Sequence, residues 1–567
     1  MNGAQSLVNA LRAHGIEHIF GLPGDTGMAF YDALYHEPAI THIMTRDERS
    51  ASFMADVYAR VSGRIGVCEG PSGGGATYIV PGVAEAHGSA IPMLCLTSDT
   101  PVGEEHRGVL TELDQVALFR PLTKWSERVN RAAGMEDAVH RAVRLATSDR
   151  PGAAHLSLPS DVLEEEEGTA ARAAQPSRGF APRSRPRADA GEVQRAADLI
   201  TRAARPVIVA GGGVLTSRAW GELTRLAEST GIPVGTSING KGAIAETSAC
   251  SIGVVGGNGA RTYANQWIRE ADLVFFVGTR TDSTTTSAWT LPDRANPPVT
   301  IHLDMSGKEI GNTYPSSATL HGDAKATLED LMAAIGSTTG TKAAATERLA
   351  RLEAERRGYF ESIQGETDST AQPIKPQRLV ATMRKLFDDD TIIVADPGTP
   401  TPYLAAQYQV RVAGRTTVIP RAHGGLGYAI PGVVGAHLAA PRKRTIGMLG
   451  DGSFGMSVGE LETISRLNLP VVLIQCGNGT FGWIKQLQHL YHDRRYYSVD
   501  FTNLDYAAIA RGFGFDGHHV TDPDDLEPVL ASALASGKPT FLNVVTEPQM
   551  TETPPVSSWE AAVARTM

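Results

Sequence analysis

The chain has 567 residues, of which 42% are hydrophobic and 20% are charged, a balance typical of globular enzymes. Its length exceeds what a single hydrophobic core supports and predicts about three or four domains. The net charge of −10 at pH 7 argues against nucleic acid or an anionic membrane as the main partner.

The N-terminal residues begin directly with an amphipathic helix pattern. No signal peptide is recognisable, and no apolar run is long enough to span a bilayer. The four cysteines are scattered without C-x-x-C spacing, and three of them fall in apolar runs. This pattern predicts buried free thiols in a reducing cytoplasm. The four are Cys68, Cys95, Cys250 and Cys476.

Apolar strands alternate with helical periods in three α/β blocks, and each block is expected to form a doubly wound parallel sheet. The blocks span residues 1–165, 191–340 and 372–548. Blocks one and three show a similar alternation of strand and helix patterns, which predicts two sheets of one type. The predicted strands are 18–20, 43–46, 65–69 and 93–98 in the first block, 206–210, 272–278 and 300–304 in the second, and 391–395, 445–449, 471–476 and 540–545 in the third.

The segments between and after the blocks have distinct compositions. A charged stretch, 164–189, is interpreted as a solvated linker, and an Ala/Arg/Glu-rich stretch, 343–360, predicts a helix in the second linker. The polar tail, 552–567, contains one Trp and is expected either to pack over a site or to be loose.

Two polar side chains follow neighbouring strands of the third block. Asp451 stands in Gly450-Asp451-Gly452-Ser453, and Asn478 stands in Gly477-Asn478-Gly479-Thr480, with a predicted helix and strand between them. In a parallel sheet both would lie at the carboxyl edge, where ligands bind. A carboxylate, an amide oxygen, a carbonyl and phosphate oxygens suit Mg²⁺, and glycines let backbone N–H groups approach a diphosphate. A structural turn is the alternative for Gly-Asp-Gly alone.

This pattern resembles the metal and diphosphate motif of thiamine diphosphate (ThDP) enzymes, in which Gly-Asp-Gly is followed by an Asn-Asn pair. The resemblance implies that Asp451, Asn478 and the carbonyl of Thr480 hold Mg²⁺, with Gly477 in place of the first Asn. The order of the blocks resembles the acetolactate synthase and pyruvate oxidase branch. It implies a pyrimidine-binding domain (1–165), a central domain (191–340) and a diphosphate-binding domain (372–548).

The segment 45–56 resembles the family's Arg-His-Glu-x-x-Ala-x-x-Met-Ala segment, which ends a strand and opens a helix. The resemblance implies that Glu48 is the catalytic carboxylate that activates the cofactor through its aminopyrimidine ring. Asp47 is adjacent, and the register set by Met54-Ala55 favours Glu48. The alternative is a carboxylate that only stabilises the helix dipole. Burial should raise the pKa of Glu48 enough for it to share a proton.

Further loops resemble cofactor-binding loops of the family. Gly398 and Thr399 match a loop beside the diphosphate, and Gly425 and Leu426 match a turn in which a bulky residue wedges the cofactor into its bent shape. A core position is the alternative for Leu426. The resemblance extends cofactor contacts to Gly450, Gly452, Ser453, Asn478, Thr480, Phe481 and Gly482.

The substrate side departs from the family pattern. The loop 69–78 matches the family's Gly-Pro-Gly-Ala-Thr-Asn loop only partly, and Thr111 stands where many relatives carry a Gln. Trp483 and Gln488 are the other candidates for the substrate pocket, and an exposed amphipathic helix is the alternative for each. The His-His pair of simple decarboxylases is absent, which favours carbon–carbon ligation.

The sequence of the central block does not decide whether this block binds a nucleotide cofactor. Gly211-Gly212-Gly213 after a strand is weak evidence for a nucleotide, and acetolactate synthases bind FAD in this domain. The family's Arg-Phe-Asp-Asp-Arg reads Arg280-Thr281-Asp282-Ser283-Thr284 here, so bound FAD and no FAD are both retained.

Taken together, the sequence predicts a ThDP- and Mg²⁺-dependent enzyme of the acetolactate synthase type. It would decarboxylate a 2-oxo acid, in the first instance pyruvate, and pass the two-carbon unit to a carbonyl acceptor. The alternatives are a carbon–carbon lyase, decarboxylase or hydrolase on another substrate, a flavin-linked pyruvate oxidase, and an inactive cofactor-binding scaffold. In the family the active site joins two subunits, which implies a homodimer or homotetramer.

Overall fold

The computed structural model describes residues 1–166, 184–336, 342–502 and 504–566. The chain forms two compact units. Unit 1 comprises Met1–Arg183, Pro420–Lys443 and Gly455–Leu469, and unit 2 comprises Ser184–Ile419, Arg444–Phe454 and Pro470–Met567. Most of the linker predicted at 164–189 lies outside the described residues. No described helix combines the length and the apolar character needed to cross a membrane.

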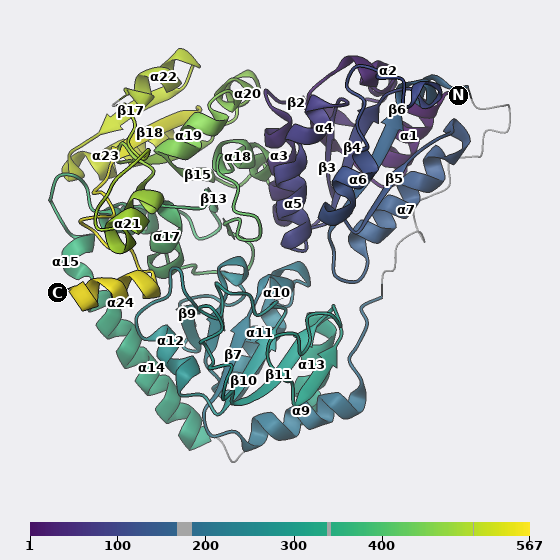
Figure 1. The fold of residues 1–567 in the computed structure, drawn as a ribbon. Coiled ribbons are helices and arrows are strands. Elements are labelled where there is room, and N and C mark those ends of the chain that lie inside the picture. Colours follow the sequence, from purple (N-terminus) through teal and green to yellow (C-terminus); the bar gives the residue numbers. More distant parts are fainter. Residues whose placement is uncertain (167–183, 337–341, 503, 567) are drawn as a thin grey trace. The chain divides into compact units, whose positions relative to one another are not determined.

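Unit 1 is built on a six-stranded parallel sheet in the order β2-β1-β3-β4-β6-β5 (Figure 1). The strands are β1 (His18–Gly21), β2 (Thr41–Met44), β3 (Gly66–Gly70), β4 (Met93–Asp99), β5 (Trp125–Arg128) and β6 (Ala153–Pro159). Helices α1 (Gly3–Ala13), α2 (Met28–Tyr35) and α7 (Met135–Thr147) share one apolar core with this sheet. Their hydrophobic stripes are what the helical periodicity of the sequence encodes.

Helix α3 (Glu48–Ser62) packs on β3, between α5 (Val80–Gly88) and α18 (Ala429–Ala439). Asp47 caps its start by accepting the N–H of Arg49 at 2.7 Å, and Gly63 ends it with a φ of 70°. Glu48 is therefore the first residue of a helix that begins just after β2, as the sequence predicts.

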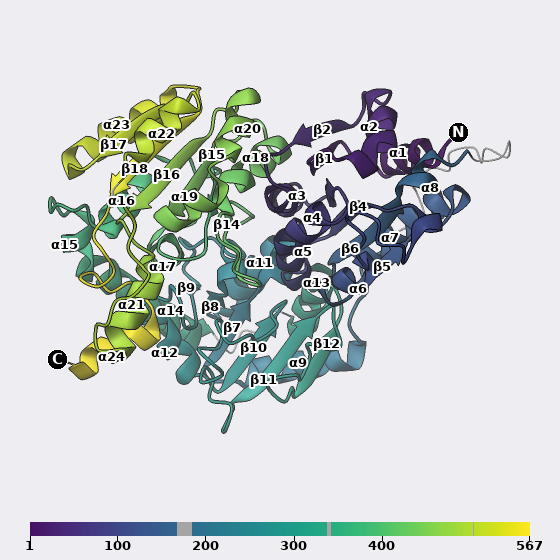
Figure 2. The same ribbon diagram turned by 45° about the horizontal axis from the view of Figure 1, so that its top comes forward.

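Unit 2 contains two six-stranded parallel sheets, in the orders β12-β11-β10-β7-β8-β9 and β14-β13-β15-β16-β18-β17 (Figure 2). The central sheet consists of β7 (Pro206–Ala210), β8 (Val234–Thr236), β9 (Ser251–Val254), β10 (Leu273–Val277), β11 (Val299–Asp304) and β12 (Ala318–His321). The C-terminal sheet consists of β13 (Ile392–Ala395), β14 (Thr417–Val418), β15 (Thr445–Gly450), β16 (Val472–Gly477), β17 (Asp516–Val520) and β18 (Thr540–Val545).

The sheets of blocks one and three have the same topology, because β13 to β18 repeat the order of β1 to β6. This confirms the prediction of two sheets of one type, and the α/β class with three parallel sheets. In the C-terminal sheet the strand order reverses between β13 and β15. The carboxyl edge at such a reversal is where doubly wound sheets bind ligands.

Every predicted strand is present, with its ends shifted by at most two residues. The strands that the sequence analysis missed are short or carry polar residues. β17, for example, reads Asp516-Gly517-His518-His519-Val520, and β14 has only two residues. β6 was missed because it contains His155 and Ser157, although it is fully buried. The missed strands are β5, β6, β8, β9, β12, β14 and β17.

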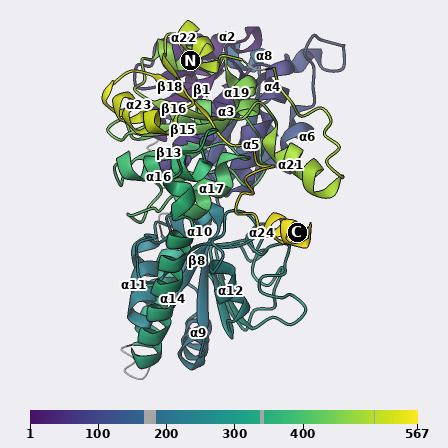
Figure 3. The same cartoon turned by 90° about the vertical axis from the view of Figure 1, so that its left-hand side faces the viewer.

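The predicted linker helix is α14 (Lys342–Ser362; Figure 3), and its N-terminal part contacts the C-terminal end of α11 (Trp220–Thr230). Arg348 of α14 donates to the carbonyls of Thr230 at 3.2 Å and Gly231 at 3.3 Å. The tail forms α24 (Ser557–Thr566) and packs within unit 2. All four cysteines are buried and free, as predicted.

Candidate active site

Asp451 lies at the end of β15, where it opens the short helix α19 (Asp451–Ser457). One carboxylate oxygen accepts the N–H groups of Asn478 and Gly479, both at 2.8 Å, and the other accepts a bond from Gln475 Nε2 at 2.8 Å. Burial raises the pKa of Asp451 above its usual value, although these donors act in the opposite direction. A cation at this edge would compensate for the burial of the charge.

Asn478 follows β16, the neighbour of β15, so the two predicted metal ligands lie at one edge. Asn478 Oδ1 accepts the N–H of Thr480 at 3.3 Å, and the Thr480 carbonyl accepts the N–H of Gly482 at 2.9 Å. The described residues hold no cluster of three His, Cys, Asp or Glu side chains suited to a metal. A cation here would therefore depend on one carboxylate, neutral oxygens and the phosphates of a cofactor.

Three glycines at this edge face open space. They are Gly398 after β13, Gly450 at the end of β15 and Gly479 after β16, and no atom lies within 4 Å of an ideal Cβ on any of them. Gly398 and Gly479 have φ angles of 120° and 69°, which favour glycine. Beside Gly398, the buried Thr399 precedes α17 (Pro400–Gln407). Such exposed backbone leaves the room that a diphosphate needs.

Other predicted cofactor positions serve packing. A Cβ on Gly452 would overlap the ring of Phe481, and that ring packs edge-on against Phe501 with centroids 4.6 Å apart. Ser453 is buried. These contacts hold together the turn after β15 and the turn after β16.

Helix α21 (Gly482–Tyr491) carries the two pocket candidates of unit 2. The ring of Trp483 lies against Trp559 of α24, with centroids 4.3 Å apart. The Gln488 amide pairs with the backbone of Tyr497, donating to its carbonyl at 3.0 Å and accepting its N–H at 2.9 Å. Both side chains thus have structural contacts within unit 2.

In unit 1, the Glu48 carboxylate is 7% exposed and faces the glycine loop that follows β3. An ideal Cβ on Gly75 would lie 3.1 Å from Glu48 Oε1, and one on Gly70 would lie 3.3 Å from Glu48 Cγ. Burial raises the pKa of Glu48, and the nearby acids Asp47 and Glu69 raise it further. A carboxyl group that keeps its proton more readily is suited to proton sharing with an aminopyrimidine.

A buried charge network holds the loop that precedes Gly425 and Leu426. Glu85 accepts the N–H groups of Ala422 at 3.1 Å and His423 at 2.7 Å, and it pairs with Arg60 at 3.0 Å. Arg60 also pairs with Asp56 at 2.9 Å, and Asp56 accepts a bond from the Tyr428 hydroxyl at 2.5 Å. The network thus fixes the loop on both sides of the predicted wedge.

Gly425 and Leu426 lie in unit 1, beside α3. An ideal Cβ on Gly425 would be 3.1 Å from Phe53 Cζ of that helix. Leu426 is half-buried, and it is not among the fully buried apolar side chains.

Thr111 lies in the loop between β4 and α6 (Gln115–Phe119) and has a φ of 70°. Its Oγ1 is 2.7 Å from Ser72 Oγ of the glycine loop. Leu110, 83% exposed, in the Thr111 loop and Tyr78, 63% exposed, at the end of the short helix α4 (Gly74–Tyr78) both present large side chains to solvent. Thr111 therefore contacts the loop after β3, the other segment that departs from the family pattern.

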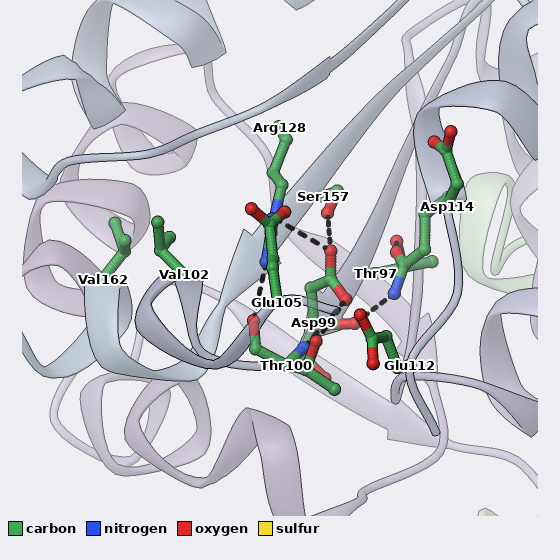
Figure 4. Close-up of polar contacts among 12 residues, drawn as sticks. Thr97, Asp99, Thr100, Val102, Glu105, Glu112, Asp114, Arg128, Ser157 and Val162 are labelled. Carbon is green, nitrogen blue, oxygen red and sulfur yellow. Dashed lines mark hydrogen bonds and ion pairs between the residues drawn. The ribbon is translucent and has the colours of Figure 1, made fainter. Parts of the chain in front are cut away.

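An ion-pair cluster anchors the start of the Thr111 loop (Figure 4). Arg128 at the end of β5 pairs with Asp99 at 3.2 Å and with Glu105, and it donates to the Thr100 carbonyl at 2.9 Å. Ser157 Oγ of β6 donates to Asp99 at 2.6 Å. The end of β4 and the residues that follow it are thereby tied to its neighbour β6 and to β5 at the edge of the sheet.

In the central block, the glycine run is explained by packing. A Cβ on Gly211 would overlap the carbonyl of Gly278, and one on Gly213 would lie 2.7 Å from Gly278 Cα. Asp282 caps a local turn by accepting the N–H groups of Thr284 and Thr285 at 2.9 and 3.0 Å. None of these contacts requires a nucleotide.

The structure gathers the predicted residues in two places. Unit 2 brings together Gly398, Thr399, Gly450, Asp451, Gly452, Asn478 and Gly482, whereas Glu48, Thr111, Gly425 and Leu426 belong to unit 1. Sequence reasoning missed the roles of Asp56, Arg60, Glu85, Tyr428, Gln475 and Gln549. A charged or amide residue inside an apolar run, such as Arg60 or Gln475, was the available signal for some of them.

Models of thiamine pyrophosphate enzymes match three parts of the chain. The N-terminal TPP binding domain matches residues 1–118, the central domain residues 193–331, and the C-terminal TPP binding domain residues 396–544. The first range includes Glu48 and Thr111, and the third includes Asp451 and Asn478.

The chain is also similar over nearly its whole length to named proteins. It is 34% identical over 559 residues to a probable acetolactate synthase large subunit of Methanocaldococcus jannaschii, covering 97% of this chain and 92% of that protein. It is 30% identical over 542 residues to an acetolactate synthase of Mycobacterium bovis (94% and 86%). It is 28% identical over 551 residues to the acetolactate synthase isozyme 3 large subunit of Escherichia coli (94% and 92%).

Proposed function

Because this chain belongs to the thiamine pyrophosphate (ThDP) enzyme family, we propose that it is an acetolactate synthase-like carboligase. It uses ThDP and Mg²⁺ to decarboxylate a 2-oxo acid, in the first instance pyruvate, and ligates the remaining acyl unit to a carbonyl acceptor. The observation that carries the proposal is the position of Asp451 and Asn478 at one sheet edge, where the Asn478 N–H donates to the Asp451 carboxylate beside open glycine backbone.

ThDP supplies the carbanion chemistry of such a reaction. In our proposal Asp451, Asn478 and the Thr480 carbonyl hold Mg²⁺, and the backbone at Gly398, Gly450 and Gly479 lies along the diphosphate. Two observations support this fit. Burial raises the pKa of Asp451, and the glycines leave open space.

Glu48 is proposed to hold the proton that it exchanges with the aminopyrimidine of ThDP. Its burial, its raised pKa and its place against Gly70 and Gly75 support that role. The half-buried Leu426 is proposed to contact the cofactor as the wedge, on a loop that Glu85 holds.

The direct test is CO₂ release from pyruvate by purified protein supplied with ThDP and Mg²⁺, with and without EDTA. We expect release that EDTA abolishes and that excess Mg²⁺ restores. Analysis of the products formed when carbonyl acceptors are added then identifies the ligation step. Metal-independent release would contradict the proposed metal site, and no release would exclude pyruvate as the donor.

A second candidate function is carbon–carbon cleavage or decarboxylation of a larger substrate by the same cofactor. The Thr111 substitution and the partial match of residues 69–78 favour it, because both depart from the family's substrate loops. The exposed Tyr78 and Leu110 lie in or beside these segments. A screen of branched and aromatic 2-oxo acids for ThDP-dependent CO₂ release distinguishes it from the first candidate.

FAD in the central block remains a proposal with one supporting observation. Asn258 is buried, and neither polar atom of its amide has a partner among the described residues. Visible flavin absorbance of the purified protein tests it. A colourless protein that retains no bound flavin after incubation with FAD would contradict this proposal. It would also exclude the flavin-linked oxidase.

A further inference from the structure

Gln549 is a buried glutamine whose side chain has no hydrogen-bond partner within the described part of the chain. It is 0% exposed, and neither Oε1 nor Nε2 is bonded. A buried amide without partners lowers stability, since both polar atoms have lost their hydrogen bonds to water. Its presence at this position therefore needs a physical explanation.

The backbone around Gln549 is firmly held. The Thr546 N–H donates to the Gly477 carbonyl at 2.9 Å, which extends the pairing of β18 with β16. Lys375 forms ion pairs with Glu547 and Glu552, both at 2.6 Å. Because the segment is tethered on both sides of Gln549, the position of its amide is set by the fold.

The amide faces Asn478 across Gly482. An ideal Cβ on Gly482 would lie 3.1 Å from Gln549 Oε1, 3.1 Å from Asn478 Nδ2 and 3.2 Å from Thr399 Oγ1. Glycine at position 482 thus leaves three polar groups around one small space.

The chemistry of an amide ligand explains this arrangement. When an Asn binds a cation through Oδ1, its Nδ2 carries two N–H donors that need acceptors. Gln549 Oε1 is an unpaired acceptor that faces the same space as Asn478 Nδ2. Groups that hydrogen-bond to metal ligands fix the orientation of those ligands and support affinity.

We propose that Gln549 is a positioning residue for the metal, whose Oε1 accepts an N–H from Asn478 Nδ2 and thereby directs Asn478 Oδ1 toward the Mg²⁺ of bound ThDP. The inference rests on the metal site of the proposed function. Gln549 acts through Asn478 and touches neither metal nor cofactor, in agreement with its complete burial.

The test is a titration of apo-protein with Mg²⁺ at saturating ThDP, followed by calorimetry and by tryptophan fluorescence, since Trp483 adjoins Gly482. Gln549→Met removes both polar atoms and keeps the length of the side chain. We expect a loss of Mg²⁺ affinity of about tenfold. The thermal midpoint of the apo-protein should not fall, because the variant removes an unpaired buried amide. Unchanged affinity, or a lost affinity that accompanies a lowered apo midpoint, would overturn the proposal.

A double variant isolates the contact. Asn478→Asp keeps an oxygen ligand and removes Nδ2, so adding Gln549→Met in that background should leave Mg²⁺ affinity unchanged. The same loss in both backgrounds would show that Gln549 does not act through Nδ2. Measurements on wild-type protein distinguish a failure of the proposed metal site from a failure of the proposed Gln549 role. If this protein shows no Mg²⁺-dependent ThDP binding, the metal site and the Gln549 role both fail, and if it binds but Gln549→Met binds equally, only the role fails.

Discussion

In the proposed function Glu48 is the residue that activates the cofactor, and the fold prepares it for this role in two ways. The start of α3 buries its carboxylate against the glycine loop, and the acids Asp47 and Glu69 oppose its ionisation. Asp47, one residue earlier, has a structural role, because its carboxylate caps the start of the helix. Two adjacent acids thus have separate roles that follow from the direction of each side chain.

Replacing Glu48 by Gln should lower ThDP-dependent turnover by about 100-fold or more, because Gln cannot exchange a proton with the aminopyrimidine. Turnover is measured as CO₂ release, and ThDP affinity, measured by calorimetry, should change little. Asp47→Asn is the matched control, since Asn also caps helices. Near wild-type turnover of the Glu48 variant would mean that another group activates the cofactor.

At the scale of elements, the packing of α3 on α18 depends on buried charges. Asp56, Arg60, Glu85 and Tyr428 form one connected network, and each of them is buried. Burial by itself would raise the pKa of Glu85, but Arg60 and the N–H groups of the loop outweigh burial and hold that pKa below its usual value. Burial raises the pKa of Asp56 in the same network, so the two acids contribute to the pH dependence of stability with opposite signs.

Glu85→Gln should cost about 3 kcal/mol of stability at neutral pH, because it leaves a buried guanidinium underpaired. A lowered folded-state pKa stabilises the protein above the unfolded-state pKa, and that contribution disappears as the pH falls through the folded-state value. The difference between wild type and variant should therefore shrink below the ordinary Glu pKa of 4.5. Urea unfolding at several pH values measures it, with the exposed Glu104→Gln as control. A difference that is constant with pH would contradict the assignment.

The pairing of β16 with β18 explains why Gly477 departs from the family's Asn-Asn pair. A Cβ at Gly477 would overlap Oδ1 of Asn543 on β18. Asn543 Oδ1 accepts from Gln475 Nε2 at 3.3 Å, and its Nδ2 lies 2.9 Å from His519 Nδ1. A polar side chain on β18 therefore occupies the space that a side chain at 477 would need.

Restoring the family residue with Gly477→Asn should destabilise the protein by about 1–3 kcal/mol through overpacking. Adding Asn543→Ala should recover much of the loss, because it removes the atoms that clash. Thermal unfolding of the single and double variants measures the coupling. Equal midpoints of the two would show that Asn543 does not exclude a side chain at position 477.

At the scale of the whole molecule, the predicted machinery is divided between two units. Unit 1 carries Glu48, Thr111 and Leu426, and unit 2 carries Asp451 and Asn478. The family resemblance places an active site between the first block of one subunit and the third block of another. We therefore expect a homodimer as the smallest active form.

Subunit mixing tests this expectation. Glu48→Gln and Asp451→Ala proteins should each be inactive, but after subunits are exchanged a mixed dimer has one site with both residues intact. About a quarter of wild-type activity per subunit should return at equal mixing. Each variant mixed with itself is the control. No recovery, with exchange verified by mass, would place both residues of a site on one subunit.

The sequence by itself determined the α/β class, the three blocks and the strands of the sheet interiors, because apolar runs of β-branched residues are local signals. Short and edge strands such as β14 and β17 could not be predicted, since their pairing depends on neighbours distant in sequence. The Asp451 and Asn478 motif could be recognised from the sequence because both residues directly follow clearly apolar strands. The start of α3 at Glu48 was predicted from the resemblance of residues 45–56 to a strand-to-helix segment of the family.

Only the tertiary structure decided which polar residues act together. Glu85 is far in sequence from the loop at 421–424, and Gln549 is far from Asn478, which we propose it positions, so no local pattern connects either pair. The same holds for Gly477, whose missing side chain is explained by Asn543 on a neighbouring strand. Hydrogen bonds and overlaps act over a few ångströms, and folding alone brings these groups within that range.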